Sequence, residues 1–255
     1  MNNKPFFSII IPAHNEEGCI SKTIHTIVAQ FVMQGIEDYE ILIINDNSTD
    51  NTKKILKGLV VQFPEVRYLN NNPPHGFGFA VRKGLENYKG EAVAIVMADL
   101  SDSPEDILKY YHKIKEGAEC VFGSRFCKDS QVVNYPKIKL MVNRIANIFI
   151  KILFRLDYND ITNAFKCYRR EVINGIKPIL SHHFNLTVEL PLKAIVRGYS
   201  YEIVPISWTN RETGESKLIL KEMGSRYLFI VLYVWLERLL SRNDYHRMNL
   251  KKCGL

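Results

Sequence analysis

The first 123 residues alternate between short apolar runs and helix-like segments, and this alternation restricts the possible folds strongly. The apolar runs are rich in Ile and Val, as strands buried on both faces of a sheet usually are. Strands that alternate with helices indicate parallel βαβ units in one covered sheet. The predicted strands are Phe6–Ile11, Tyr39–Ile44, Val66–Asn70, Ala92–Met97 and Cys120–Gly123, and the predicted helices are Glu17–Phe31, Asp50–Phe63, Phe77–Tyr88 and Pro104–Lys115.

Polar and acidic residues follow three of these predicted strands. Because the carboxyl ends of parallel strands meet at one edge of a sheet, we expect these residues to share a rim where a ligand binds. Clustered carboxylates repel one another unless a cation or hydrogen-bond donors lie among them. The sequence therefore predicts a ligand site at this edge, with a cation or hydrogen-bond donors among the carboxylates. The three segments are Pro12–Glu16, Asn45–Asp50 and Ala98–Asp102.

The net charge of +7 favours an anionic partner, which leaves nucleic acid, a phosphorylated small molecule or a membrane surface. We expect no nucleic acid partner, since no basic segment is interleaved with aromatic residues and the predicted rim is acidic. The five cysteines form no CxxC pair, so neither a zinc site nor a disulfide framework is indicated. This cysteine usage favours a reducing, cytoplasmic compartment.

Two apolar segments distinguish the second half of the chain. In residues 139–155 the polar positions recur every four residues, with Arg144 as the one exception, and the rest of the segment is apolar. Residues 227–236 carry no charge. The second segment is too short to cross a bilayer, which takes about 20 apolar residues. Each segment fits a helix packed inside the protein or a helix lying in a membrane interface. We expect a catalytic domain over residues 1–220 and an interfacial helix with a basic tail over residues 221–255.

Several motifs occur in an order that resembles one enzyme family. PAHNEE, DNSTD, GFGFAVRKG, ADLSDSPE and GSR resemble the inverting family-2 glycosyltransferases of GT-A fold. The later motifs DITNAFKCYRR, VEL, GYSYEIVPISW and RETGESK resemble the dolichyl-phosphate mannosyltransferase branch, which makes polyprenyl-phosphate sugars. This resemblance implies an α/β fold of GT-A (Rossmann-like) type, with a mostly parallel sheet flanked by helices and C-terminal amphipathic interface helices.

The resemblance implies that the rim binds a nucleotide sugar, a GDP- or UDP-hexose. Arg211 and Lys217 belong to a segment that we expect to close on the diphosphate, because Arg and Lys both bind phosphate oxygens well. The donor-binding residues implied are Pro12, His14, Glu16, Ile44, Asp46, Ala98, Arg211 and Lys217.

The resemblance also implies a bound Mg²⁺ or Mn²⁺ ion, with Asp99 as its central ligand and as a catalytic residue. Ser101 stands where the family often has a glutamine ligand, and Asp102 is an additional candidate. Met97 stands where the family usually has an aspartate, and a thioether is a poor ligand for a hard cation. We therefore expect a ligand set that differs from the usual one.

A lipid phosphate acceptor is already anionic at pH 7 and needs cations to hold it in line rather than a general base. The resemblance implies Arg125 as a catalytic residue between the donor and acceptor phosphates, with Lys139 and Asn143 at the acceptor phosphate. These residues stand beside the apolar segment 139–155. We expect inverting transfer of a mannose- or glucose-like hexose to dolichyl or undecaprenyl phosphate, by a peripheral enzyme on the cytoplasmic membrane face.

Three further expectations stay open. A small membrane partner subunit or a homo-oligomer is compatible with this function. A family-2 transferase that uses a glycan hydroxyl in surface polysaccharide synthesis would keep the same fold and donor. A non-catalytic subunit that binds a nucleotide sugar would account for Met97 and Ser101.

Overall fold

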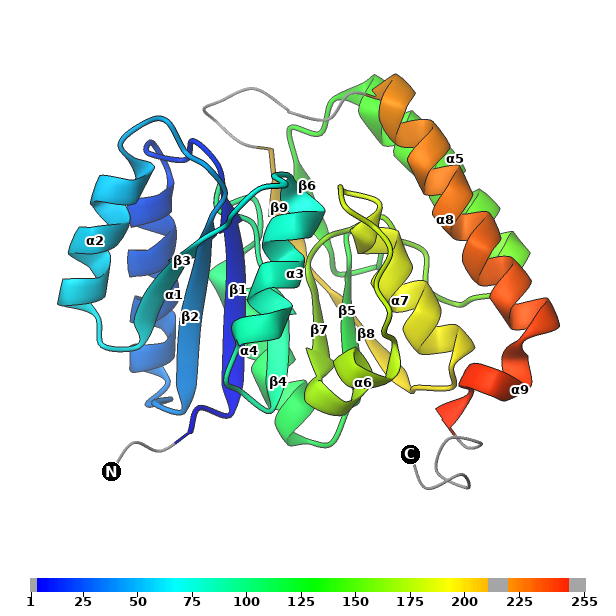
Figure 1. Ribbon diagram of the computed structural model, residues 1–255, viewed down its shortest axis with the longest axis horizontal. Coiled ribbons are helices and arrows are strands. Elements are labelled where there is room, and N and C mark those ends of the chain that lie inside the picture. The colour runs from blue at the N-terminus through cyan, green and yellow to red at the C-terminus, as the bar shows by residue number, and fades with distance from the viewer. Residues whose placement is uncertain (1–3, 211–219, 248–255) are drawn as a thin grey trace.

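The computed structural model describes residues 4–210 and 220–247. Its centre is a seven-stranded sheet in the order β3-β2-β1-β4-β7-β5-β8, and β6 pairs with β9 beside it. Helices lie on both sides of the sheet (Figure 1). The strands are β1 (Phe7–Ala13), β2 (Tyr39–Asn45), β3 (Val66–Asn70), β4 (Ala92–Ile95), β5 (Cys120–Ser124), β6 (Gln131–Val133), β7 (Lys166–Arg169), β8 (Tyr201–Pro205) and β9 (Ser207–Thr209).

Most of the sheet is parallel, as predicted. β1 pairs in parallel with β2 and β4, and β5 pairs in parallel with β8. β7 is antiparallel to both of its neighbours, β4 and β5. At one edge Ala13 pairs with Asn45, which pairs with Asn70, so the carboxyl ends of β1, β2 and β3 are level. The loops that follow these strands therefore start from one line.

The helices form two layers. α1, α2 and α4 contribute to the core on one face of the sheet, and α3, α6 and α7 contribute to the core on the other. The four predicted helices of the first half occur within three residues of their predicted bounds. The helices are α1 (Ile20–Met33), α2 (Thr52–Gln62), α3 (Phe77–Asn87), α4 (Pro104–Lys115), α5 (Lys137–Phe154), α6 (Arg170–Gly175), α7 (Leu186–Val196), α8 (Leu220–Leu240) and α9 (Arg242–Tyr245).

α5 and α8 lie side by side along one flank of the molecule (Figure 1). α8 also packs on α7 and buries Ile230, Val231 and Val234. Both helices also expose apolar side chains, which on α5 are Ile138, Met141, Val142, Ile145, Ile148, Phe149 and Ile152 and on α8 are Leu228, Phe229, Leu232, Leu236, Leu239 and Leu240. The division of the chain at residue 220 stays a prediction, and α8 is packed directly on the preceding part.

Two further results concern the described residues alone. Across residues 4–210 and 220–247, none of the helices has both the length and the apolar character required to cross a bilayer. The cysteines within these ranges, Cys19, Cys120, Cys127 and Cys167, are free thiols.

Candidate functional site

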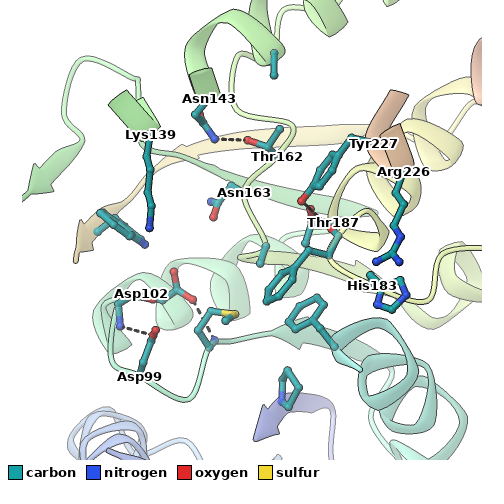
Figure 2. A pocket seen from close by; sticks show the side chains of 18 of the residues that line it. Asp99, Asp102, Lys139, Asn143, Thr162, Asn163, His183, Thr187, Arg226 and Tyr227 are labelled. Carbon is teal, nitrogen blue, oxygen red and sulfur yellow. Dashed lines mark hydrogen bonds between the residues drawn. The ribbon is translucent and has the colours of Figure 1, made fainter. Parts of the chain in front are cut away.

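A single cavity of about 1080 Å³ begins at the carboxyl ends of β1, β2 and β4 and continues between α5 and α8 (Figure 2). Ten of the predicted site residues line it together: Pro12, His14, Glu16, Asp46, Asp99, Ser101, Asp102, Arg125, Lys139 and Asn143. The side chains of Ile44 and Ala98 are instead buried in the two cores, and they are not among the lining residues. Arg211 and Lys217 lie outside the described residues.

The acidic loop, residues 97–102, follows β4 and is held by its own side chains. The backbone N–H of Ser101 donates to Asp99 Oδ1 at 3.1 Å, and that of Met97 donates to Asp102 Oδ2 at 3.2 Å. Leu100 has a φ of 57°, a left-handed conformation that is strained for a branched, non-glycine residue. The loop therefore adopts a strained backbone conformation at Leu100, and in this conformation Asp99 and Asp102 line the cavity.

Asp99 and Asp102 place two carboxyl groups at this end of the cavity. Asp102 is only 3% exposed, and its burial, followed by the nearby charge of Asp99, raises the pKa of its carboxyl to about 7. Among the described residues no three His, Cys, Asp or Glu side chains form a metal-binding group. The donor set fits a hard cation that takes oxygen ligands from this loop and its remaining ligands from a substrate or water.

Asp46 fixes the loop that leads into α3. Its Oδ1 accepts hydrogen bonds from Asn71 Nδ2 at 2.8 Å and His75 Nδ1 at 3.0 Å, and its Oδ2 accepts one from the Gly76 N–H at 2.8 Å. The Asp46 carbonyl also accepts a bond from His14 Nδ1 at 2.6 Å. Both carboxylate oxygens are thus engaged within the protein, and the predicted contact of Asp46 with a base stays a prediction.

The glycine-rich motif at the start of α3 has a packing role. A Cβ at Gly78 would lie 2.6 Å from the backbone nitrogen of His183, so only glycine lets this loop approach the helix. The Phe79 ring stacks on His182 with centroids 4.5 Å apart, and Phe77 stacks on Phe184 at 4.3 Å. The motif therefore docks residues 181–185 onto α3, where His183 and Phe184 line the cavity.

Arg125 is held in place by Asp160. Its Nε and Nη2 donate to the two carboxylate oxygens at 2.8 and 2.7 Å, and the side chains of both residues are buried. Burial disfavours the charged guanidinium, but the negative charge of Asp160 outweighs this, so the pKa of Arg125 lies above its ordinary value. The rings of Tyr135 and Trp208 lie 5.5 and 5.8 Å from the guanidinium carbon. Arg125 thus lines the cavity while its guanidinium is paired with Asp160.

Lys139 and Asn143 lie one turn apart on α5. Figure 2 shows the Lys139 side chain pointing from α5 towards the acidic loop. Asn143 instead donates from Nδ2 to the hydroxyl of Thr162 at 2.7 Å and accepts from Asn147 Nδ2 at 2.9 Å. The predicted contact of Asn143 with a phosphate therefore competes with bonds that it already makes.

The apolar part of the cavity was not predicted in detail. It is lined by side chains of α5 and α8, namely Val142, Ala146, Phe149, Ile150, Leu228 and Val231. Tyr227 also lines it and donates its hydroxyl to the Phe184 carbonyl at 3.0 Å. The uncharged run 227–236 predicted an apolar helix here. Its sequence did not indicate which face of the helix lines the cavity.

The chain is similar in sequence to a known enzyme family and to two of its named members. The family model described as glycosyl transferase family 2 matches residues 8–176. Polyprenol monophosphomannose synthase of Mycolicibacterium smegmatis is 30% identical over 216 residues, which cover 82% of this chain and 80% of that protein. Dolichol-phosphate mannosyltransferase of Pyrococcus furiosus is 32% identical over 221 residues, which cover 83% of this chain and 58% of that protein.

Solved structures of another enzyme have the same fold as this chain. Glucosyl-3-phosphoglycerate synthase from Mycobacterium tuberculosis, in complex with UDP, aligns with a TM-score of 0.67 at 17% identity, covering 92% of this chain and 80% of that one. The same enzyme with Mn²⁺, UDP and phosphoglyceric acid aligns equally well, covering 78% of that chain. This likeness confirms the predicted GT-A type of fold.

Proposed function

The chain belongs to glycosyl transferase family 2 and is a glycosyltransferase, and we propose that it transfers a hexose from a nucleoside diphosphate sugar to a polyprenyl phosphate, with inversion, at the cytoplasmic membrane face. The two relatives above, which are named for polyprenol and dolichol phosphate mannose synthesis, support this acceptor class.

One observation carries the proposal. A single cavity joins an acidic loop at the sheet edge to an apolar groove between α5 and α8. A nucleoside diphosphate needs a cation at its phosphates, whereas an isoprenoid chain needs a hydrocarbon wall. Transfer of a sugar from a nucleotide sugar to a polyprenyl phosphate needs both environments in one cavity, because the two substrates must meet there. Lys139 lies at the junction and points towards the acidic loop (Figure 2).

At the donor end, Asp99 with Ser101 and Asp102 would hold Mg²⁺ or Mn²⁺, and the ion would stabilise the negative charge that develops on the leaving nucleoside diphosphate. The carboxyl groups of Asp99 and Asp102 line the same cavity wall, and a bound cation would favour the charged form of Asp102, whose pKa is raised by burial and by the nearby Asp99. Pro12, His14 and Glu16 would contact the nucleoside. The structural relative crystallised with Mn²⁺ and UDP supports a cation of this kind.

At the acceptor end, the lipid phosphate would attack without prior loss of a proton, so no general base is required. Lys139 would supply positive charge, and the fixed Arg125 would supply hydrogen-bond donors beside it. The lipid chain would follow the groove between α5 and α8. The exposed apolar side chains of these two helices would rest in the membrane interface, where such a face is stable without a protein partner.

The test uses the purified full chain with Mn²⁺, radiolabelled GDP-mannose or UDP-glucose, and undecaprenyl or dolichyl phosphate in detergent. We expect label to pass into organic solvent only when both substrates are present, and to be released by mild acid, as a glycosyl phosphate would be. Labelled product that stays in water with a glycan acceptor would favour the hydroxyl-acceptor alternative. Tight nucleotide binding with no transfer to either acceptor would favour a binding subunit.

A further inference from the structure

Thr162 lies at the centre of a small hydrogen-bond network on the wall of the cavity (Figure 2). Its Oγ1 accepts from Asn143 Nδ2 at 2.7 Å and from Asn147 Nδ2 at 2.9 Å. Both asparagines belong to α5, one turn apart, while Thr162 precedes β7. The hydroxyl is therefore held between two amide groups of another element.

The orientation of each amide follows from the network itself. The backbone N–H of Thr162 donates to Asn147 Oδ1 at 3.2 Å, which turns Asn147 Nδ2 towards Thr162 Oγ1. Asn147 Nδ2 also lies 2.9 Å from both the carbonyl oxygen and Oδ1 of Asn143, so its two hydrogens are shared among three acceptors. The contact with Oδ1 leaves Asn143 Nδ2 to face Thr162. Since Asn147 is 1% exposed, bulk water does not compete for these bonds. Both groups next to Oγ1 are consequently donors.

A threonine hydroxyl has two acceptor positions and a single hydrogen to donate. The two atoms that face Thr162 Oγ1 are amide nitrogens, which can donate a hydrogen bond but cannot accept one. Among the hydrogen bonds of residues 4–210 and 220–247, none is donated by this hydroxyl to a protein acceptor. Its hydrogen is thus directed away from the two asparagines and is available to a ligand in the cavity.

We propose that Thr162 donates its hydroxyl hydrogen to an anionic oxygen of the acceptor phosphate, and that Asn143 and Asn147 are positioning residues that hold the hydroxyl in this orientation. The ligand class is a phosphate monoester of a long apolar alcohol, an identity that rests on the proposed function. Lys139 lines the same cavity four residues before Asn143 and supplies the positive charge. In this chain Thr162 thus takes the direct contact that the family resemblance assigns to Asn143.

This arrangement predicts a specific preference. A hydroxyl that can only donate favours a ligand atom that can only accept, which describes an ionised phosphate oxygen better than an alcohol. Hydrogen bonds to charged groups contribute more than neutral ones, so the loss of this one is expected to weaken phosphate binding about tenfold. Binding of the matching alcohol should depend much less on Thr162.

The experiment measures calorimetric binding of farnesyl phosphate and of farnesol to the full chain, for wild type, Thr162→Ser and Thr162→Val. We expect Ser to bind farnesyl phosphate within threefold of wild type and Val to bind it about tenfold more weakly. Farnesol affinity should be equal in all three. The valine variant removes the acceptor of Asn143 Nδ2, while Asn147 Nδ2 keeps its bonds to Asn143. This variant will melt lower, so binding is measured well below its melting temperature.

Asn147→Leu tests the positioning role. It keeps the Thr162 hydroxyl but removes one donor to it, so the ratio of farnesyl phosphate affinity to farnesol affinity should fall. A merely structural role for Asn147 would lower the melting temperature and leave this ratio unchanged.

The outcomes separate this inference from the proposed function. If Thr162→Val binds farnesyl phosphate as tightly as Thr162→Ser, or if wild type does not bind farnesyl phosphate, the inference is wrong. If wild type binds it through Thr162 and yet transfers no sugar to polyprenyl phosphate, the inference stands and the proposed function fails. If wild type transfers sugar and the valine variant has an unchanged KM for the lipid, the function stands and the inference fails.

Discussion

Arg197, the residue directly after α7, and Glu237 on α8 form a buried ion pair, in which Nε and Nη2 of Arg197 donate to the two carboxylate oxygens at 2.8 and 2.9 Å. Their side chains are 3% and 4% exposed. Because α8 supplies one wall of the apolar groove, this pair holds that wall against the end of α7.

Removing one member of the pair should destabilise the protein. Glu237→Ala would leave the Arg197 guanidinium buried without its partner, which costs about 3–5 kcal/mol of unfolding free energy. Urea denaturation followed by circular dichroism measures the change. Glu116→Ala removes an exposed partner of Lys113 and serves as the control, with an unchanged midpoint. An equally small effect at Glu237 would contradict the assigned role.

Asp99→Asn should lower the rate of sugar transfer about 100-fold while the circular dichroism spectrum and melting temperature stay close to wild type. The reason is the loss of a carboxylate that would hold the cation beside the diphosphate. EDTA should likewise stop transfer, and added Mn²⁺ should restore it in wild type alone. The control is Asp129→Asn, an exposed position; full activity in the Asp99 variant would exclude the proposed cation site.

Gly78→Ala should be destabilising by about 2 kcal/mol, because the new Cβ would collide with the backbone of His182 and His183 rather than with a side chain that can move. Gly58→Ala is the matched control, since nothing lies within 4 Å of a Cβ built there in the middle of α2. The control should gain about 0.5–1 kcal/mol from the higher helix propensity of alanine. Equal effects at both glycines would show that α3 does not need the close approach.

The stability contributed by Lys166 should depend on pH. Burial lowers its pKa to about 7, while its Nζ donates to the carbonyls of Ile161 and Thr187 at 2.9 and 3.2 Å. Between pH 7 and 10.5 the unfolded chain binds more protons than the folded one at this site, so stability here rises with pH. The burial penalty is fully present below about pH 7 and is relieved as the pH approaches 10.5.

Lys166→Met cannot titrate, so wild type should gain stability relative to this variant between pH 7 and 9.5. Urea unfolding at several pH values measures the difference. Lys115→Met is the control: the hydrogen bond to Asp38 raises the pKa of Lys115 above its ordinary value, and its difference from wild type should stay flat over that range. A flat difference for Lys166 as well would contradict the prediction.

Membrane binding should require the apolar face of α5. Ile145 is 61% exposed on that helix. Ile145→Asp should weaken sedimentation with vesicles containing phosphatidylglycerol about tenfold, because burying one isoleucine side chain contributes about 1.5–3 kcal/mol. Val61→Asp makes the same chemical change at a position 89% exposed on α2, on the opposite flank of the molecule (Figure 1). It should bind like wild type, and equal losses in both variants would indicate a charge effect only.

Local patterns predicted the alternation of the first half well. Pro104–Lys115 occurs at its predicted bounds, because a proline at the first helical turn, acidic residues after it and basic residues at the end all act within the segment itself. The three loops after β1, β2 and β4 were likewise predicted to meet, since parallel strands necessarily bring their carboxyl ends to one edge. Ten of the predicted site residues line the resulting cavity.

Long-range pairing was beyond these patterns. The spacing of residues along β7 does not reveal that it runs antiparallel between β4 and β5, because direction depends on which strands it bonds. The same holds for polar side chains: Arg125 pairs with Asp160 and Asn143 with Thr162 only when distant segments pack together. Periodicity and turn chemistry are properties of neighbouring residues and can be read along a chain, whereas the partner of a buried polar group is chosen by packing in three dimensions.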